Sequence, residues 1–392
     1  MRRAMTGLAC LAGVLLAATA ANAQGTVKIG VVMSFSGQFA DPGAQIDNGI
    51  KLYMKQNGDT VAGKKIEIIR KDSGGIAPDV AKRLSQEVIV RDGAEILAGY
   101  DLTPNALAAT DVSAQAKKFM VNMNAATSVI TTKSPYMART SFTVWALNEE
   151  LGKWAYRNGV RKAYTLVSDF GPGHDGEAAF TRGFKDAGGE IIGSARYPVP
   201  NIDFTAFLQR AKDSNPDGIY IWVPGGPQPA AIGKAIAERG IDKSKVKIMG
   251  QGELTYEDAL KSMGDAGLGL ITAFHYDFNH QSAKNKAFVA AYNADFKRNP
   301  DMFSVGGYDG MHLIYEVLKK TNGNTDGEAL IAAAKGMKWE SPRGPMMIDP
   351  ETRDVVETVY IRRVEKVGGQ LLNVEFDKIE DVKDPWKARQ PK

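Results

Sequence analysis

Short apolar runs alternate with longer amphipathic stretches along most of this chain. Residues 27–33 form the first apolar run, and the stretch after it carries Ile46, Ile50 and Met54 at helical spacing. Strand-length apolar runs recur at 65–69, 95–99, 119–122, 163–167, 190–197, 218–222, 246–249 and 268–274. Helix-length segments such as 77–90, 104–114, 179–187 and 227–238 separate most of these runs. Strands joined by helices in this rhythm predict an α/β fold, with parallel sheets covered by helices on both faces.

The alternation runs through the chain twice, with a restart after Thr140. Each pass is about one domain long, and 392 residues exceed what one hydrophobic core usually organises, so two lobes are expected. The chain after residue 283 does not continue the alternation of strands and helices. Two helices are predicted at 283–298 and 305–321, and strands at 355–364 and 370–374 are expected to form a hairpin. The segment 383–392 is polar and contains proline, so we expect it to be loosely held.

The N-terminus has the three parts of a secretory signal peptide. Arg2 and Arg3 precede an apolar run at 8–20, and Ala21-Asn22-Ala23 supplies an A-x-A cleavage site. The apolar run is short for a transmembrane anchor, and Cys10 lies inside it rather than at a lipoprotein cleavage point. We therefore predict that residues 1–23 are removed near Ala23 and that the product acts outside the cytoplasm.

Composition and charge exclude several classes of protein. The chain has 49 Lys+Arg and 45 Asp+Glu, and a net charge of +4 is too mild to indicate nucleic-acid binding. Cys10 is the only cysteine, so an intramolecular disulfide or a cysteine metal cluster is excluded. The four histidines have no metal-binding spacing, and there is neither a serine-hydrolase elbow nor a phosphate-binding P-loop. We expect no metal, no catalytic residues and, since no later stretch is apolar enough to span a bilayer, no membrane insertion.

The loops that follow predicted strands carry the candidate chemistry, because ligands of open parallel sheets bind beyond the carboxyl ends of the strands. Three of these loops, 34–43, 99–105 and 122–128, are rich in hydroxyl, amide and small side chains. Thr103 before Pro104 indicates a helix start, which suits a carboxylate because free N–H groups and the positive end of the helix dipole point outward. Alternatively, Thr103 merely caps its own helix.

The strongest enzyme-like signal is Gly171-Pro172-Gly173-His174-Asp175-Gly176, which matches G-x-G-x-x-G after a strand and before a helix. A dinucleotide site requires an acidic residue near the end of the next strand, whereas Glu190 stands at the beginning of that strand. We therefore favour a ligand-facing loop that enters a helix and expect no cofactor. An exported oxidoreductase that uses a nucleotide cofactor remains an alternative.

Several segments together resemble one family. They are the strand 27–31 after a signal peptide, the turn Ser36-Gly37, the loops 99–103 and 124–127, the segment 249–253 and the segment 288–292. The chain resembles the type I periplasmic solute-binding proteins of ABC importers, specifically the branched-chain amino acid (Leu/Ile/Val-binding) family, from residue 27 to about 376. The resemblance implies two doubly wound lobes joined by three crossover strands. Lobe 1 would comprise 26–141 and 277–353, and lobe 2 would comprise 142–276 and 354–392.

The same resemblance implies site residues. Thr103 matches the family's ligand-carboxylate contact, and Ala125 and Thr127 match a loop that supplies a backbone group and a hydroxyl. In the second lobe this chain departs from the pattern, because Phe170 stands where a tyrosine is expected, Pro224 where an aromatic residue is expected, and Glu253 lies one place from the expected carboxylate. If Glu253 does not face the cleft, the ligand is a carboxylate without an amine, since an unpaired buried ammonium is too costly.

Further predicted ligand contacts come from the loops and from aromatic residues near strand ends. They are Gln38, Phe39, Tyr100 and Tyr276, with Trp222 also available to pack against a ring. By its resemblance, the protein captures a small carboxylate, an aromatic acid or a branched-chain amino acid, by hinge closure. It would act as a periplasmic monomer that delivers this ligand to an ABC permease of the inner membrane. A ligand-sensing receptor domain is the other alternative.

Overall fold

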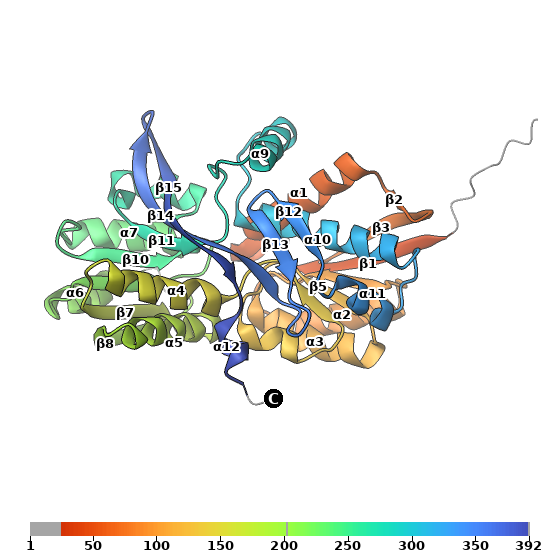
Figure 1. The fold of residues 1–392 in the computed structure, drawn as a ribbon, viewed down its shortest axis with the longest axis horizontal. Helices are drawn as coiled ribbons and strands as arrows, with labels where there is room; N and C mark the ends of the chain where they lie inside the picture. Colours follow the sequence, from red (N-terminus) through yellow and green to blue (C-terminus); the bar gives the residue numbers. More distant parts are fainter. Residues whose placement is uncertain (1–24, 201–202, 391–392) are drawn as a thin grey trace, which may run out of the picture.

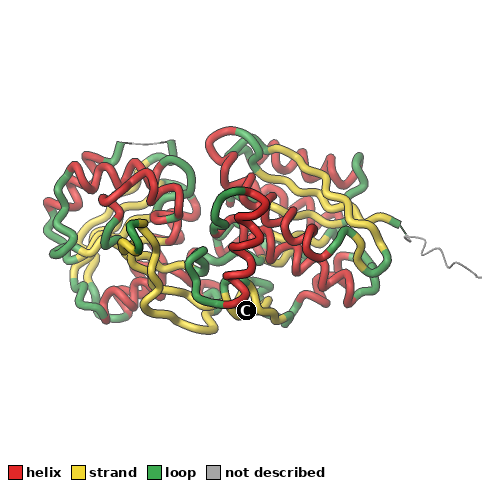
Figure 2. Tube along the Cα trace, turned by 90° about the horizontal axis from the view of Figure 1, so that it is seen from above, coloured by secondary structure: helices red, strands yellow, loops and turns green. Residues whose placement is uncertain are grey.

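The computed structural model describes residues 25–200 and 203–390. The predicted signal peptide, 1–23, lies outside these residues. The described chain forms two α/β halves, and each encloses a sheet between helices (Figures 1 and 2). Within the described ranges, no helix has both the length and the apolar character needed to cross a membrane.

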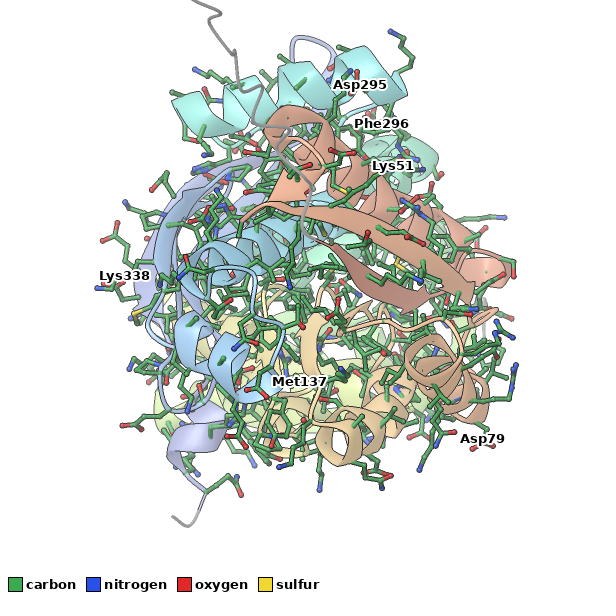
Figure 3. The ribbon with its side chains drawn as sticks, turned by 90° about the vertical axis from the view of Figure 1, so that its right-hand side faces the viewer. Lys51, Asp79, Met137, Asp295, Phe296 and Lys338 are labelled. Carbon is green, nitrogen blue, oxygen red and sulfur yellow. The ribbon has the colours of Figure 1, made fainter. Side chains whose placement is uncertain are left out.

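The first half is built on a six-stranded sheet in the order β2-β3-β1-β4-β5-β6, parallel except where β2 meets β3. The strands are β1 (Thr26–Met33), β2 (Thr60–Val61), β3 (Lys64–Asp72), β4 (Ile96–Gly99), β5 (Phe119–Asn122) and β6 (Met137–Arg139). The helices packed with them are α1 (Ala40–Asn57), α2 (Pro78–Val90), α3 (Thr103–Ala116), α9 (Ala283–Phe296), α10 (Met302–Lys320) and α11 (Gly327–Ala334). Charged side chains such as Lys51 and Asp79 lie on the outer face of these helices (Figure 3).

The second half is built on β7 (Lys162–Ser168), β8 (Glu190–Tyr197), β9 (Gly218–Trp222), β10 (Lys247–Gln251), β11 (Ile271–Phe274), β14 (Val355–Val367) and β15 (Gln370–Val382). Strands β7 to β11 are parallel, and β14 pairs antiparallel with both β11 and β15. The helices are α4 (Val144–Arg157), α5 (Gly171–Asp186), α6 (Thr205–Asp213), α7 (Gln228–Glu238) and α8 (Glu257–Met263). Short 3-10 turns η1 (Gly37–Phe39), η2 (Ser128–Thr132), η3 (Gly252–Thr255) and η4 (Gly264–Gly267) join the elements of both halves.

The chain passes between the halves after β6, after β11 and before β14. The hairpin of β12 (Lys338–Ser341) and β13 (Gly344–Ile348) pairs with the start of β14, while Ser341 bonds Asp309 of α10. The prediction of two doubly wound α/β lobes with crossover strands is confirmed. The predicted hairpin of β14 and β15 also forms, with a longer second strand than the sequence indicated.

Buried arginines hold the crossing segments together. Arg139 lies 3.1 Å from Asp354, Arg343 lies 2.9 Å from Glu357, and Arg362 lies 3.2 Å from Asp277. Each arginine is at most 2% exposed, so each charge depends on its carboxylate partner and on nearby backbone carbonyls.

The C-terminal segment departs from the prediction. Instead of being loosely held, it forms the short helix α12 (Pro385–Ala388) beside α4 and η2. Lys387 pairs with Asp354, and Arg389 makes two 2.7 Å hydrogen bonds to Glu149. The polar composition that suggested looseness supplies these ion pairs, and Trp386 of the same helix is partly buried.

Candidate functional site

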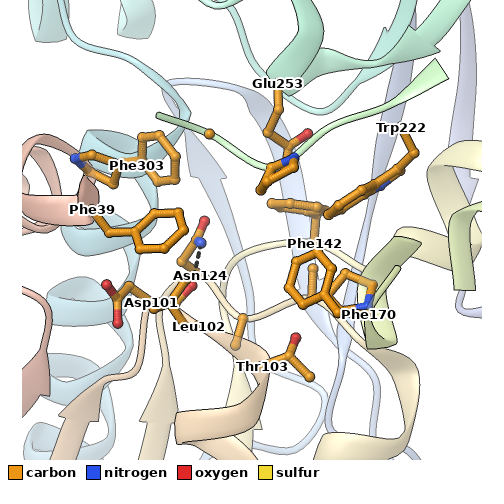
Figure 4. A pocket seen from close by; sticks show the side chains of 16 residues that line it. Phe39, Asp101, Leu102, Thr103, Asn124, Phe142, Phe170, Trp222, Glu253 and Phe303 are labelled. Carbon is orange, nitrogen blue, oxygen red and sulfur yellow. Dashed lines mark hydrogen bonds between the residues drawn. The ribbon is translucent and has the colours of Figure 1, made fainter. Parts of the chain in front are cut away.

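A cavity lies where loops from the two halves meet, and its empty space of about 520 Å³ includes the part that is open to solvent (Figure 4). Its walls come from the loops after β1, β4, β5, β7, β9 and β10, from the crossing segment before α4, and from the start of α10. The lining residues are Phe39, Pro42, Asp101, Leu102, Thr103, Asn124, Ala125, Ala126, Phe142, Phe170, Pro172, Trp222, Pro224, Gly225, Glu253 and Phe303.

One end of the cavity is polar and suits an anion. Thr103 is the first residue of α3, after the N-cap Leu102, and its Oγ1 lies 3.0 Å from Oγ1 of Thr127. The hydroxyl of Thr103 therefore does not cap its own helix, which overturns that alternative. Both threonines are almost fully buried, and the Thr103 side chain lines the cavity.

A second helix begins at the same place from the other half. A Cβ atom built at Gly171, the first residue of α5, would lie 3.8 Å from Cγ2 of Thr103 and 3.9 Å from Oγ1 of Thr127. The first N–H groups of a helix have no partner within it, and its N-terminus carries positive partial charge. Two such termini, from α3 and α5, thus meet at this end of the cavity.

The rest of the wall is mainly aromatic. Phe39, Phe142, Phe170, Trp222 and Phe303 contribute rings, with proline carbons beside them. Phe170 and Trp222 form an edge-on pair with ring centroids 5.6 Å apart. Phe142 stacks on the buried ring of His275 at 4.7 Å. Such a wall favours a flat apolar group that can pack against ring faces and edges.

Glu253 lines the cavity from η3, opposite Thr103 in the view of Figure 4. Burial raises the pKa of its carboxyl to about 7, although a hydrogen bond from Gln251 and the charge of Arg362 act in the opposite direction. Because Glu253 faces the cavity, the condition that would have excluded an amine is not met. A carboxyl with a pKa of about 7 is only partly ionised near neutral pH, so it is a weaker counter-charge for an ammonium than an exposed carboxylate.

Asp101 also lines the cavity, although no sequence pattern singled it out. Its Oδ2 accepts a 3.1 Å hydrogen bond from the N–H of Ser34, and burial raises its pKa to about 6. Asn124 donates to the carbonyl of Asp101 at 2.7 Å. These bonds tie the loops after β1, β4 and β5 together, so we assign them to holding the floor of the cavity.

The predicted site residues that line the cavity are Phe39, Thr103, Ala125, Phe170, Pro224 and Glu253. Thr127 is not among the lining residues but contacts the hydroxyl of Thr103. The backbone of Ala125 already has partners, because its N–H donates to Tyr100 and its carbonyl accepts from Asn122 at 2.6 Å. In this arrangement Ala125 contributes its methyl group to the wall rather than a polar contact.

Tyr100, Tyr276 and Gln38 do not line the cavity, which corrects the expectation made for them. The ring of Tyr100 lies in the core beside α2, where its hydroxyl bonds Ser85 at 2.8 Å. Tyr276 is buried against Phe288 and Tyr292, and its hydroxyl donates to Asn285. Gln38 is exposed on η1. Strand-end position alone does not tell which side of a loop a side chain takes.

Two of the three glycines in the G-x-G-x-x-G segment are explained by the packing of α5 against β7 and β9. A Cβ at Gly173 would lie 1.9 Å from the carbonyl oxygen of Ser168, and one at Gly176 would lie 2.6 Å from the ring of Trp222. Both glycines therefore let the helix approach β7 and β9 closely. The prediction of a loop that enters a helix at the site agrees with Phe170 and Pro172 lining the cavity.

The family model described as "Periplasmic binding protein" matches residues 26–370. The chain belongs to the periplasmic binding protein family. Among relatives, the "Leu/Ile/Val-binding protein homolog 6" of Brucella melitensis is 41% identical over 381 residues, which cover 96% of this chain and 97% of that protein. The predicted resemblance to the Leu/Ile/Val-binding family is thereby confirmed.

Solved structures of periplasmic binding proteins extend the comparison. A solute-binding protein of an ABC transporter from Rhodopseudomonas palustris BisB5, in complex with 3,4-dihydroxybenzoic acid, is 53% identical with a TM-score of 0.89, covering 92% of this chain and 99% of that one. One from R. palustris HaA2, in complex with p-hydroxybenzoic acid, is 40% identical with a TM-score of 0.90, covering 93% and 100%.

Membership in this family makes the chain a solute-binding protein of the ABC-transporter type and not an enzyme. The oxidoreductase alternative is therefore set aside. Sequence reasoning missed Phe142 and Phe303 as cavity residues. Phe303 follows a helix start far along the chain, and no local pattern distinguishes it from a core residue.

Proposed function

We propose that this periplasmic binding protein captures an aromatic carboxylate of the hydroxybenzoate class. The observation that carries the proposal is the cavity itself, which combines five aromatic side chains with two helix N-termini at one end. The hydroxybenzoates bound by the two R. palustris proteins each have a flat aromatic ring, which suits the aromatic wall, and a carboxylate, which suits the helix N-termini. A branched-chain amino acid would fill the same space with less ring contact.

In the proposed complex the carboxylate lies between Thr103 and the N-terminus of α5. The ring packs among Phe39, Phe142 and Phe170, and a ring hydroxyl reaches Glu253 at the far side. Charge-assisted hydrogen bonds contribute about 1.5–3 kcal/mol each. A buried ring of about 150 Å² adds about 4 kcal/mol at about 25 cal/mol per Å². These terms suffice for a micromolar Kd, which requires about −8 kcal/mol after association costs.

In transport, the protein would capture its ligand by closing two lobes around it. Lobe 1 (26–141 and 277–353) and lobe 2 (142–276 and 354–392) would close around the ligand, because contacts from both lobes exist only in the closed form. Residues 1–23 would direct export to the periplasm and be removed. The mature protein would act as a monomer and present its ligand to an ABC permease of the inner membrane. The approach of Gly171 to Thr103 supports contacts of this kind between the lobes.

A ligand panel tests the proposal. We expect 4-hydroxybenzoate and 3,4-dihydroxybenzoate to raise the melting temperature and to bind with Kd values near micromolar in calorimetry. Leucine and valine should bind at least about 100-fold more weakly, since they lack ring contacts and place an ammonium beside a Glu253 that is only partly ionised. The matched control is 4-hydroxybenzamide, which keeps the ring and hydroxyl but not the negative charge and should bind poorly. Leucine or valine as the best ligand would contradict the proposal.

A further inference from the structure

A line of buried polar side chains stands behind Glu253 in the second half of the molecule. The hydroxyl of Tyr220, on β9, donates to Oδ1 of Asn148, on α4, at 2.8 Å. Nδ2 of Asn148 donates to Oε1 of Gln251, at the end of β10, at 2.6 Å. Nε2 of Gln251 donates to Oε2 of Glu253 at 2.6 Å. Tyr220, Asn148 and Gln251 are at most 1% exposed, and Glu253 is 6% exposed.

The direction of this line is determined by a backbone carbonyl. Nδ2 of Asn148 also donates to the carbonyl of Val144 at 2.7 Å, and a carbonyl can only accept. The amide nitrogen of Asn148 must therefore face Val144 and Gln251, while its oxygen faces the Tyr220 hydroxyl. Gln251 in turn must present its oxygen to Asn148 and its nitrogen to Glu253. The side-chain amides of Asn148 and Gln251 then each have only one orientation that satisfies their hydrogen bonds.

We propose that Gln251, oriented by Asn148, is a positioning residue that occupies Oε2 of Glu253 and turns Oε1 toward a ring hydroxyl of the ligand. The line thus selects aromatic carboxylates that carry a hydroxyl at the end of the ring opposite the carboxylate. This inference rests on the proposed function and names the part of the molecule that sets its specificity. Gln251 itself does not line the cavity and acts through Glu253.

The charged and titratable groups around Glu253 are few, which makes the influence of Gln251 measurable. Arg362, on β14, favours the ionised carboxyl and lowers its pKa, and the hydroxyl of Tyr220, on β9, faces the same region. The hydrogen bond from Gln251 also lowers the pKa of Glu253 against the effect of burial. Loss of this bond therefore moves the ionisation of Glu253 to higher pH.

The ionised carboxyl accepts from a phenolic hydroxyl more strongly than the neutral one, because the bond becomes charge-assisted. Preference for a hydroxylated ring over a plain ring should then rise as pH increases through the pKa of Glu253, which burial has raised to about 7. Both ligands carry the same carboxylate, so the repulsion between that carboxylate and Glu253 cancels in the ratio of their Kd values. Asp101 lines the same cavity and burial raises its pKa to about 6, but its repulsion acts on the carboxylate that both ligands share. The ratio of the two Kd values therefore reports on the hydroxyl contact.

The experiment measures the Kd of 4-hydroxybenzoate and of benzoate by calorimetry, between about pH 5.5 and 8. The proteins are the wild type, Gln251→Leu, Glu253→Gln and the double variant. We expect Gln251→Leu to reduce the preference for 4-hydroxybenzoate about 5–10-fold at pH 7 and to move its rise to higher pH. Benzoate affinity should change little. Adding Gln251→Leu to Glu253→Gln should have no further effect on the preference, because both act on one contact.

Tyr220→Phe provides a second variant that keeps the ring stacked on Phe180 at 4.3 Å and removes only the first donor of the line. Tyr220→Phe should also reduce the preference for 4-hydroxybenzoate over benzoate, but by a smaller factor than Gln251→Leu. This variant can test the inference if Gln251→Leu does not fold. Failure of the wild type to bind either benzoate would overturn the proposed function. A wild type that prefers 4-hydroxybenzoate, with variants that keep this preference or weaken both ligands equally, would overturn only the role of Gln251.

Discussion

Replacing Arg362 by methionine is expected to lower the free energy of unfolding by about 3–5 kcal/mol. The guanidinium of Arg362 bonds the carbonyl of Tyr276 at 2.8 Å and the hydroxyl of Thr272 at 3.0 Å, and it pairs with Asp277 at 3.2 Å. Burial already raises the pKa of Asp277, and the charge of Arg362 opposes this effect. Without the arginine, Asp277 would be a buried carboxyl whose charge has lost its compensating partner.

Denaturant unfolding followed by circular dichroism measures this loss, and the next residue on β14 supplies the control. Arg363 pairs with Glu365 at 2.6 Å, but its side chain is 48% exposed. Arg363→Met should therefore cost less than about 1 kcal/mol, as exposed ion pairs usually do. Equal losses for the two variants would show that the buried pair does not hold the crossing segment between the halves.

Replacing Thr103 by alanine is expected to weaken the binding of 4-hydroxybenzoate by about 10–100-fold, the effect of losing one hydrogen bond to a charged group. The Thr103 hydroxyl lines the cavity at the start of α3, and its partner within the protein is Thr127 at 3.0 Å. The melting temperature of the unliganded protein should fall only modestly, because the hydroxyl does not cap the helix and the substitution removes only its bond to Thr127. Calorimetry of the binding reaction checks the first expectation and a thermal melt the second.

Thr110 is the matched control for this substitution. It lies on the same helix and is equally buried, but its hydroxyl donates to the carbonyl of Leu107 at 2.7 Å, within α3. Thr110→Ala should leave the affinity for 4-hydroxybenzoate unchanged. If Thr103→Ala also left the affinity unchanged, the carboxylate would have to bind elsewhere in the cavity.

The alternation of apolar runs and amphipathic stretches was sufficient to predict the architecture. Strands such as β4 and β9 are apolar along their length because both faces of a parallel sheet are covered by helices. This signal is local, so a short window of sequence contains it. The strand β6 was missed because three residues are too few to show a pattern.

The candidate site was predictable in part for the same reason. Thr103 and Phe170 follow strands directly, and the loops at the carboxyl ends of parallel strands meet at one edge of the sheet. Tyr100 satisfied the same rule and lies in the core instead. The positive φ of 60° at Tyr100 belongs to a loop conformation that no residue pattern specified.

By itself, the sequence determined the α/β class, the division into two halves and the loops from which polar contacts come, because these follow from short-range periodicity and from residue type. Only the tertiary structure decided that Phe142 and Phe303 complete an aromatic wall, that a second helix N-terminus faces Thr103, and that Gln251 orients Glu253. These features join segments far apart in the chain. Their geometry arises when the two halves pack against each other, and no local window of sequence records that packing.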